Sequence, residues 1–218
     1  MPLRVSAVCG LIAPITFIAG WLLGGLAQPD EYSLVDHDIS DLGALTAHRP
    51  WLYNQIGSNL TGLFIVALSL GLWRTVGTRL SARIGVTALA VFGVGTFLDG
   101  LLRLDCRKID AGCDRSASWH GTAHLVETGF TVLGVFVAVF ALALAFRKSA
   151  SWHDLWVVTL AAGILAIVAL VLLSLPGEGL GVGLGLGLAS GVGNGNSLAP
   201  VKNDKGADNS ELTGGLKR

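Results

Sequence analysis

Two histidines one helical turn apart are the residues whose spacing points most directly to chemistry. His120 and His124 lie in the segment SWHGTAHLVETG, and positions i and i+4 share one face of a helix. Glu127 continues the same stripe. Imidazole and carboxylate groups are ligands for a divalent metal such as zinc. The pattern therefore predicts a zinc site formed by His120 and His124, with His37 from an earlier loop as a third ligand.

Acidic residues and a serine supply candidate catalytic groups close to these histidines. Asp99 and Glu127 stand inside apolar stretches. An ionisable group there costs about 2.5–3.5 kcal/mol on insertion scales and normally faces the interior of the bundle. Asp105 lies just beyond the stretch that holds Asp99, and Ser40 lies in an acidic loop. The catalytic candidates are Asp99, Asp105, Ser40 and Glu127.

Three interpretations of this polar cluster remain open. In the first, it is structural: the histidines cap a helix mouth, and Asp99 and Glu127 pair with Arg103 or with each other. In the second, the histidines hold a metal in a membrane-embedded hydrolase of lipid-like substrates, with Asp105 or Asp99 orienting water. In the third, Asp99 and Glu127 relay protons in a transporter, which predicts a cavity that reaches both faces. The leading prediction is a polar site for a ligand or metal at the extracytoplasmic face, and a small molecule or a lipid is the expected kind of ligand.

The elements that position these residues are long apolar stretches. Hydrophobic residues make up 52% of the chain and charged residues 14%, against about 25% charged residues in soluble domains. About 20 apolar residues form a helix that spans a bilayer. The stretches cover residues 5–27, 52–73, 84–102, 125–146 and 155–175. The fold class predicted is an all-α polytopic transmembrane bundle with five firm helices and the lipid bilayer as its partner.

The charge balance and the C-terminal region limit the architecture further. Fifteen basic and fifteen acidic residues give no net charge, which argues against a nucleic-acid partner. Residues 177–192 alternate glycine with leucine or valine and form an uncertain sixth helix. Residues 193–218 are polar and predict a disordered tail. The predicted domains are therefore a membrane bundle over 1–192 and a tail over 193–218.

Charges and cysteines predict how the chain is oriented in the cell membrane. The short loops 74–83 and 147–154 carry basic residues, which favours a cytoplasmic N-terminus. The acidic loop 28–51 and the loop that contains Cys106 and Cys113 then lie outside. These two cysteines could close a disulfide on an oxidising face, and the alternative is two free thiols.

The acidic loop 28–51 allows two interpretations. Leucine and isoleucine recur at roughly helical spacing, which favours a short amphipathic helix on the outer surface. Its polar face would carry Asp36, His37, Ser40 and Asp41. The alternative is a solvated acidic loop whose polar residues cap helix ends. In either case Gly43 is expected to end the ordered turn.

The order of the polar motifs resembles that of a known family. YSLVDHDISDLGA follows the first apolar stretch, LDC stands at 104–106, and SWHGTAH stands at 118–124. Over residues 5–175 the chain resembles the prokaryotic membrane proteins catalogued as domain of unknown function 998, and ISDLGA and HGxxH are the most specific elements. The resemblance implies a full sixth helix and no assigned activity. The residues on matching motifs are Asp38, Ser40, Asp41, Asp105, His120 and His124.

Overall fold

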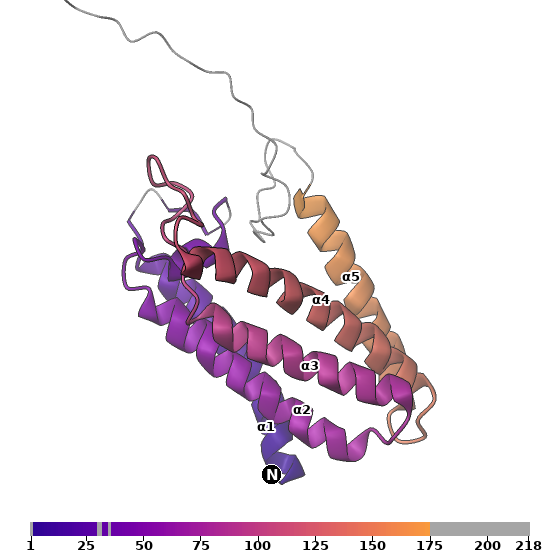
Figure 1. Ribbon diagram of the computed structural model, residues 1–218. Helices are drawn as coiled ribbons and strands as arrows, with labels where there is room; N and C mark the ends of the chain where they lie inside the picture. Colours follow the sequence, from indigo (N-terminus) through magenta and orange to yellow (C-terminus); the bar gives the residue numbers. More distant parts are fainter. Residues whose placement is uncertain (1, 30–31, 35, 175–218) are drawn as a thin grey trace, which may run out of the picture. The chain divides into compact units, whose positions relative to one another are not determined.

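Five helices long and apolar enough to cross a membrane form the described part of the chain, which is all-helical without strands (Figure 1). The computed structural model describes residues 2–29, 32–34 and 36–174. The possible helix at 177–192 and the predicted tail lie outside the described residues. The elements are α1 (Leu3–Leu26), η1 (Ile39–Gly43), η2 (Leu52–Leu60), α2 (Thr61–Thr75), α3 (Leu80–Asp99), α4 (Trp119–Arg147), η3 (His153–Leu155) and α5 (Trp156–Ser174).

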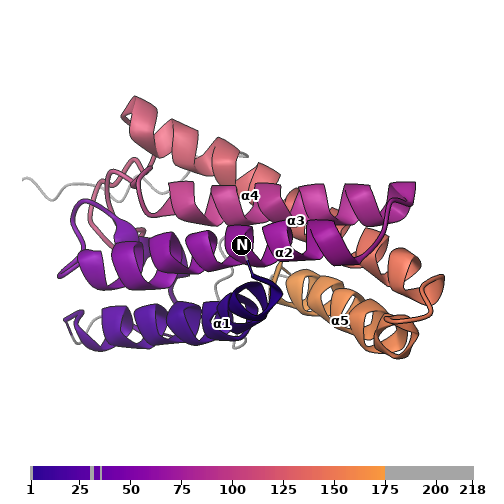
Figure 2. The same ribbon diagram turned by 90° about the horizontal axis from the view of Figure 1, so that it is seen from below.

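The helices pack in the order in which the chain visits them. α1 contacts η2 and α2, α2 contacts α3, α3 contacts α4, and α4 contacts α5 (Figures 1 and 2). Helices are the expected element, since hydrocarbon offers no partner to unpaired backbone groups. The five predicted spans are confirmed.

The second span begins as a π-helix, η2, that continues directly into α2. Its wider turns carry a polar set near the start of the span, in which Tyr53, Asn54 and Ser58 are buried. α1 lies close against η2 at Gly20, where an added Cβ would overlap the backbone of Gly57. This close approach holds the polar side chains of η2 toward the interior of the bundle.

The two ends of the bundle are closed differently. At one end a hydrophobic core packs the termini of α2, α3 and α4, and its buried members include Val76, Val86, Leu142 and Phe146. At the other end α3 stops at Asp99 and α4 begins at Trp119. The loop between them carries both loop cysteines, and we call this end the disulfide end.

The acidic loop forms a short turn at the disulfide end rather than a surface helix. η1 is a 3-10 helix of five residues that ends at Gly43, as expected. Asp41 and Leu42 are fully buried, so Asp41 does not lie on an exposed polar face as the amphipathic pattern suggested. The turn stays short because these residues pack inward against the bundle instead of lying along its surface.

Candidate functional site

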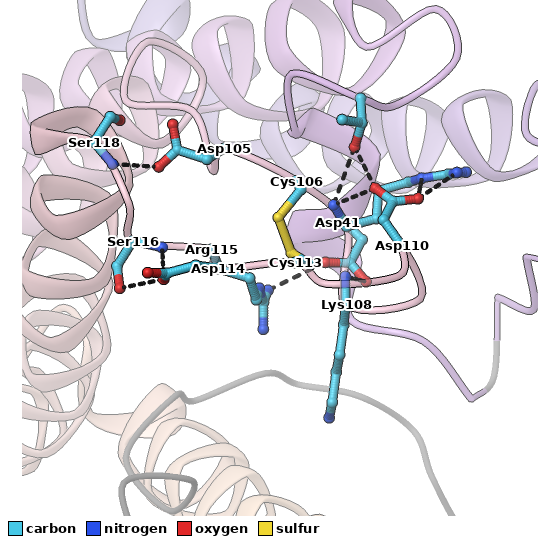
Figure 3. The surroundings of a disulfide bond; sticks show 12 residues. Asp41, Asp105, Cys106, Lys108, Asp110, Cys113, Asp114, Arg115, Ser116 and Ser118 are labelled. Carbon is cyan, nitrogen blue, oxygen red and sulfur yellow. Dashed lines mark hydrogen bonds and ion pairs between the residues drawn. A yellow bond between two sulfur atoms is a disulfide. The ribbon is translucent and has the colours of Figure 1, made fainter. Parts of the chain in front are cut away.

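A disulfide between Cys106 and Cys113 closes the loop between α3 and α4 (Figure 3). Of the two states that the sequence left open, the structure has the disulfide, with the two Cα atoms 5.8 Å apart. Inside this loop Asp110 accepts hydrogen bonds from the backbone and guanidinium of Arg107 and from Thr46. The Arg107 guanidinium is the main reason that the pKa of Asp110 falls to about 2. The Asp110 carboxylate therefore joins Arg107 and Thr46 through hydrogen bonds.

The disulfide loop holds η1 in place through one arginine. Arg115 Nη1 lies 2.7 Å from Asp38 Oδ2. Arg115 Nη2 lies 3.2 Å from Asp41 Oδ1 (Figure 3). The backbone N–H of Lys108 donates to Asp41 Oδ2 at 3.2 Å. Burial raises the pKa of Asp41, and Arg115 acts in the opposite direction. The loop thus fixes the turn that borders the interior.

Arg103 also holds this turn and does not pair with the acids inside the bundle. Its Nε donates to the Gly43 carbonyl at 3.0 Å, and its Nη2 donates to the Ala44 carbonyl at 2.9 Å. Among the described residues, neither Asp99 nor Glu127 has an ion pair with arginine or lysine. The structural interpretation that pairs these acids with Arg103 therefore finds no support.

Three side chains converge where α3 ends beside the first turns of α4. Asp99, His124 and Glu127 each offer one ligand atom, and these atoms all lie within 4.8 Å of one another. His124 is 4% exposed and Glu127 is 9% exposed. We call this group the carboxylate–histidine cluster. Two carboxylates and one imidazole are ligands that zinc accepts.

The hydrogen bonds of His124 fix which ring nitrogen is free. His124 Nδ1 lies 2.7 Å from the backbone carbonyl of Leu102 and 3.5 Å from Asp99 Oδ1. A carbonyl only accepts, so Nδ1 carries the proton, and in the neutral ring Nε2 keeps its lone pair. A metal-binding histidine usually has this arrangement, in which one ring N–H donates to a carbonyl or a carboxylate.

Both carboxylates are oriented by hydroxyl groups. Ser58 Oγ donates to Asp99 Oδ2 at 2.6 Å, and Thr131 Oγ1 donates to Glu127 Oε1. Glu127 Oε2 is buried and has no hydrogen-bond partner. A buried polar atom left unpaired costs about 1–3 kcal/mol, and more when it is charged. This oxygen therefore marks a place where a ligand would lower the free energy of the protein.

The other predicted metal ligands lie apart from this cluster. His120 is exposed, with its ring stacked on Trp119 at 3.6 Å. His37 Nδ1 accepts a hydrogen bond from the backbone N–H of Ser33. Neither residue belongs to the group of ligand atoms that contains His124.

Of the remaining catalytic candidates, Asp105 makes a structural contact, and Ser40 borders the interior cavity. Asp105 Oδ2 accepts from the backbone N–H of Ser118 at 2.8 Å, next to the start of α4 (Figure 3). This hydrogen bond is the main cause of the lowered pKa of Asp105. Ser40 borders the same cavity as Asp99 and Glu127. The role of Thr131 was not predicted, although its position four residues after Glu127 was a usable signal.

A central cavity of about 610 Å³ extends from the cluster into the bundle. Ser40, Tyr53, Asp99 and Glu127 border it at the disulfide end, and all five long helices contribute to its wall. Pockets of about 300–1,000 Å³ are typical of small-molecule sites. The cavity is thus large enough to hold a ligand against the two carboxylates.

A comparison with known protein families identifies the family of this chain. A model of the family described as "Protein of unknown function (DUF998)" matches residues 11–194. The chain belongs to this family. No curated protein and no solved structure matches the chain. The function of this DUF998 member must therefore be argued from its own site.

Proposed function

We propose that this DUF998 protein binds one divalent metal ion, zinc by its ligand chemistry, at Asp99, His124 and Glu127. The observation that carries the proposal is the buried and unpaired Oε2 of Glu127, which lies beside two further ligand atoms. A metal ion would give this oxygen the partner that the protein does not supply. With the N-terminus in the cytoplasm, as the loop charges favour, the site lies on the extracytoplasmic side.

The surroundings of the three ligands support metal binding over a purely structural cluster. Leu102 fixes the tautomer of His124, while Ser58 and Thr131 orient the two carboxylates. Such hydrogen-bonded ligands are typical of metal sites. Of the buried side-chain atoms without a hydrogen-bond partner among the described residues, Glu127 Oε2 is the one that belongs to this cluster of ligand atoms.

Hydrolysis of an ester or amide is the activity that this site favours. A zinc ion held by Asp99, His124 and Glu127 would supply Lewis-acid chemistry and would lower the pKa of a bound water to about 7. Asp99 and Glu127 border the central cavity, so a substrate there would meet the site. Water would add to the carbonyl carbon, the bond to the leaving oxygen or nitrogen would break, and the leaving group would take a proton from the water.

The extent of the cavity favours a binding site over a transport path. Its wall includes Gly10 of α1 and Val139 of α4. Beyond them, Val76, Val86, Leu142 and Phe146 pack the opposite end. A transporter would be expected to have a path to both faces, and the apolar core at this end favours a binding site instead.

Elemental analysis of the purified full chain tests the proposal. After zinc loading and removal of free metal, we expect about one zinc per chain in the wild type and far less in Glu127→Gln, because glutamine is a poor zinc ligand. His120→Ala and His37→Ala are matched controls that should keep their zinc. No bound zinc in the wild type, or loss in His120→Ala with retention in Glu127→Gln, would contradict the proposal.

A further inference from the structure

We propose that the central cavity binds the hydrocarbon chain of a neutral long-chain ester or amide, with the carbonyl end of that molecule at the carboxylate–histidine cluster. The inference rests on the proposed function and names the class of substrate for that site. It is carried by the lining of the cavity, the helices that border it, and the charge at its polar end.

The wall of the cavity changes from polar to apolar along its length. The polar groups of Asp99 and Glu127 are at the disulfide end. Farther along, the wall is formed by side chains such as Phe17, Leu68 and Val139. Water gains few hydrogen bonds in such a space, and an empty one forfeits dispersion contacts. A molecule with one polar end and one hydrocarbon chain matches this gradient.

The cavity is bordered by the first and last of the five long helices. Pro14 and Phe17 of α1 and Ala166 and Leu170 of α5 belong to its wall. Within the described residues α1 and α5 do not contact each other. No contact between the described residues of these two helices closes this side of the cavity, and we place the entry of the hydrocarbon chain here.

The charge at the polar end selects the kind of head group. Two carboxylates and one divalent ion carry no net charge together, and Arg103 is engaged by backbone carbonyls. A phosphate group is typically bound by arginine or lysine, and neither residue type is among the described residues that border this cavity. The site therefore favours an uncharged ester or amide over a phosphate-bearing lipid.

A larger hollow, of about 840 Å³, is a weaker candidate for the same role. It is bordered by residues of α3 and α4 alone, among them Val94 and Val126. Both of these side chains are about half exposed on the outside of the bundle. The central cavity is walled by all five long helices, so it can enclose a chain on more sides.

Photolabelling of the full chain in lipid nanodiscs tests this inference. The probe is a long-chain fatty amide with a diazirine near its methyl end, and the competitor is the same amide without the diazirine. We expect adducts at cavity residues such as Val139, and excess competitor should remove them. Adducts at lipid-facing residues such as Leu165 should persist, because bulk lipid contact does not saturate.

A pair of variants on α5 makes the test specific. Ala166 borders the cavity, whereas the adjacent Leu165 is 67% exposed and is not part of the wall. Ala166→Phe should lower the competable labelling by about tenfold, because the phenyl ring would occupy part of the cavity that the hydrocarbon chain needs, and tenfold corresponds to about 1.4 kcal/mol. Leu165→Phe should leave it unchanged. Both variants should still bind zinc, since neither residue touches the cluster.

The outcomes separate this inference from the proposed function. Competable labelling without zinc binding would leave the chain site standing and refute the metal. Zinc binding without competable labelling in the cavity would refute the chain site alone. A phosphate-bearing lipid that competes as well as the fatty amide would refute the assigned head group.

Discussion

Glu127 has one carboxylate oxygen that is hydrogen-bonded and one that has no partner in the described part of the chain. Thr131 holds Oε1, and Oε2 has no partner in the buried interior. An added Cβ on Gly95 of α3 would overlap Thr131 Oγ1, so α3 and α4 approach closely at this point. Close packing of two helices, and not the carboxyl group alone, sets the direction of Glu127.

The histidine spacing predicted the helix face but not which histidine joins the cluster. His120 and His124 share a stripe, yet His120 lies in the first turn of α4 and is exposed, whereas His124 is buried. The choice depends on where α3 ends, since Asp99 is its last residue. That boundary comes from packing between helices, which residue spacing does not encode.

Removing the hydroxyl of Thr131 tests whether its hydrogen bond to Glu127 strengthens metal binding. We expect Thr131→Val to lower zinc affinity by about 10–100-fold, the usual effect of losing a hydrogen bond to a ligand. Competition with a zinc-binding dye would measure it. Thr128→Val is the matched control, because the Thr128 hydroxyl donates to the backbone carbonyl of His124. Equal effects of the two variants would show that Thr131 does not act through Glu127.

At the scale of elements, η1 is held by the disulfide loop through charge. Arg115 contacts both Asp38 and Asp41, and Asp41 is fully buried. The cysteine spacing allowed the disulfide without deciding it, and glycine predicted the end of the turn at Gly43, because both are local signals. It did not predict the burial of Asp41, because that depends on Arg115, which lies 77 residues from Asp38 in the chain.

Removal of Arg115 should destabilise the chain in a way that depends on pH. Removing one partner of a buried ion pair lowers the free energy of unfolding by about 3–5 kcal/mol. Burial already raises the pKa of Asp41, and losing Arg115 raises it further. A carboxyl with a raised pKa favours the folded state at low pH, and this contribution is lost as the pH rises through that pKa. We therefore expect Arg115→Ala to be less destabilising near pH 5 than near pH 8 in thermal unfolding.

A double variant provides the control for that prediction. Asp41→Asn removes the charge that Arg115 balances, so Arg115→Ala/Asp41→Asn should recover stability at high pH relative to Arg115→Ala alone. A loss of stability in Arg115→Ala that is equal at both pH values would show that Asp41 is not the group involved.

Acid should loosen the disulfide loop itself. The lowered pKa of Asp110, about 2, means that its carboxylate stabilises the folded loop above the ordinary aspartate range. That contribution is lost as the pH falls from about 4 to about 2. Hydrogen exchange, corrected for its intrinsic pH dependence, should show loss of protection at Arg107, whose N–H donates to Asp110. Asp110→Asn should show weaker protection already at neutral pH; unchanged protection in both cases would contradict the prediction.

At the scale of the whole molecule, the five spans follow from composition. Long apolar stretches leave few alternatives to helices in a bilayer, and the structure places them near the predicted positions. The π-helical start of the second span was not predicted; it lies where Gly20 of α1 closely approaches Gly57, a contact between segments far apart in the sequence. The central cavity could not be predicted from the sequence either, because helices far apart in the chain form its wall.

The orientation in the membrane is testable with two single-cysteine additions. Leu45 is exposed at the disulfide end, and Ser151 is exposed in the loop before η3. We expect a membrane-impermeant thiol reagent added to intact cells to label Leu45→Cys and not Ser151→Cys, because the basic loops favour the cytoplasm. The unmodified chain controls for labelling at Cys9, and the reverse pattern would invert the assigned topology.

The measurement that tests the central claim most directly is zinc X-ray absorption spectroscopy on the loaded full chain. The site of Asp99, His124 and Glu127 predicts one imidazole nitrogen at about 2.0–2.1 Å and carboxylate or water oxygens at about 2.0–2.2 Å. The imidazole signal should persist in His120→Ala and disappear in His124→Ala. A spectrum with two or three imidazoles, or one that His124→Ala leaves unchanged, would contradict the account.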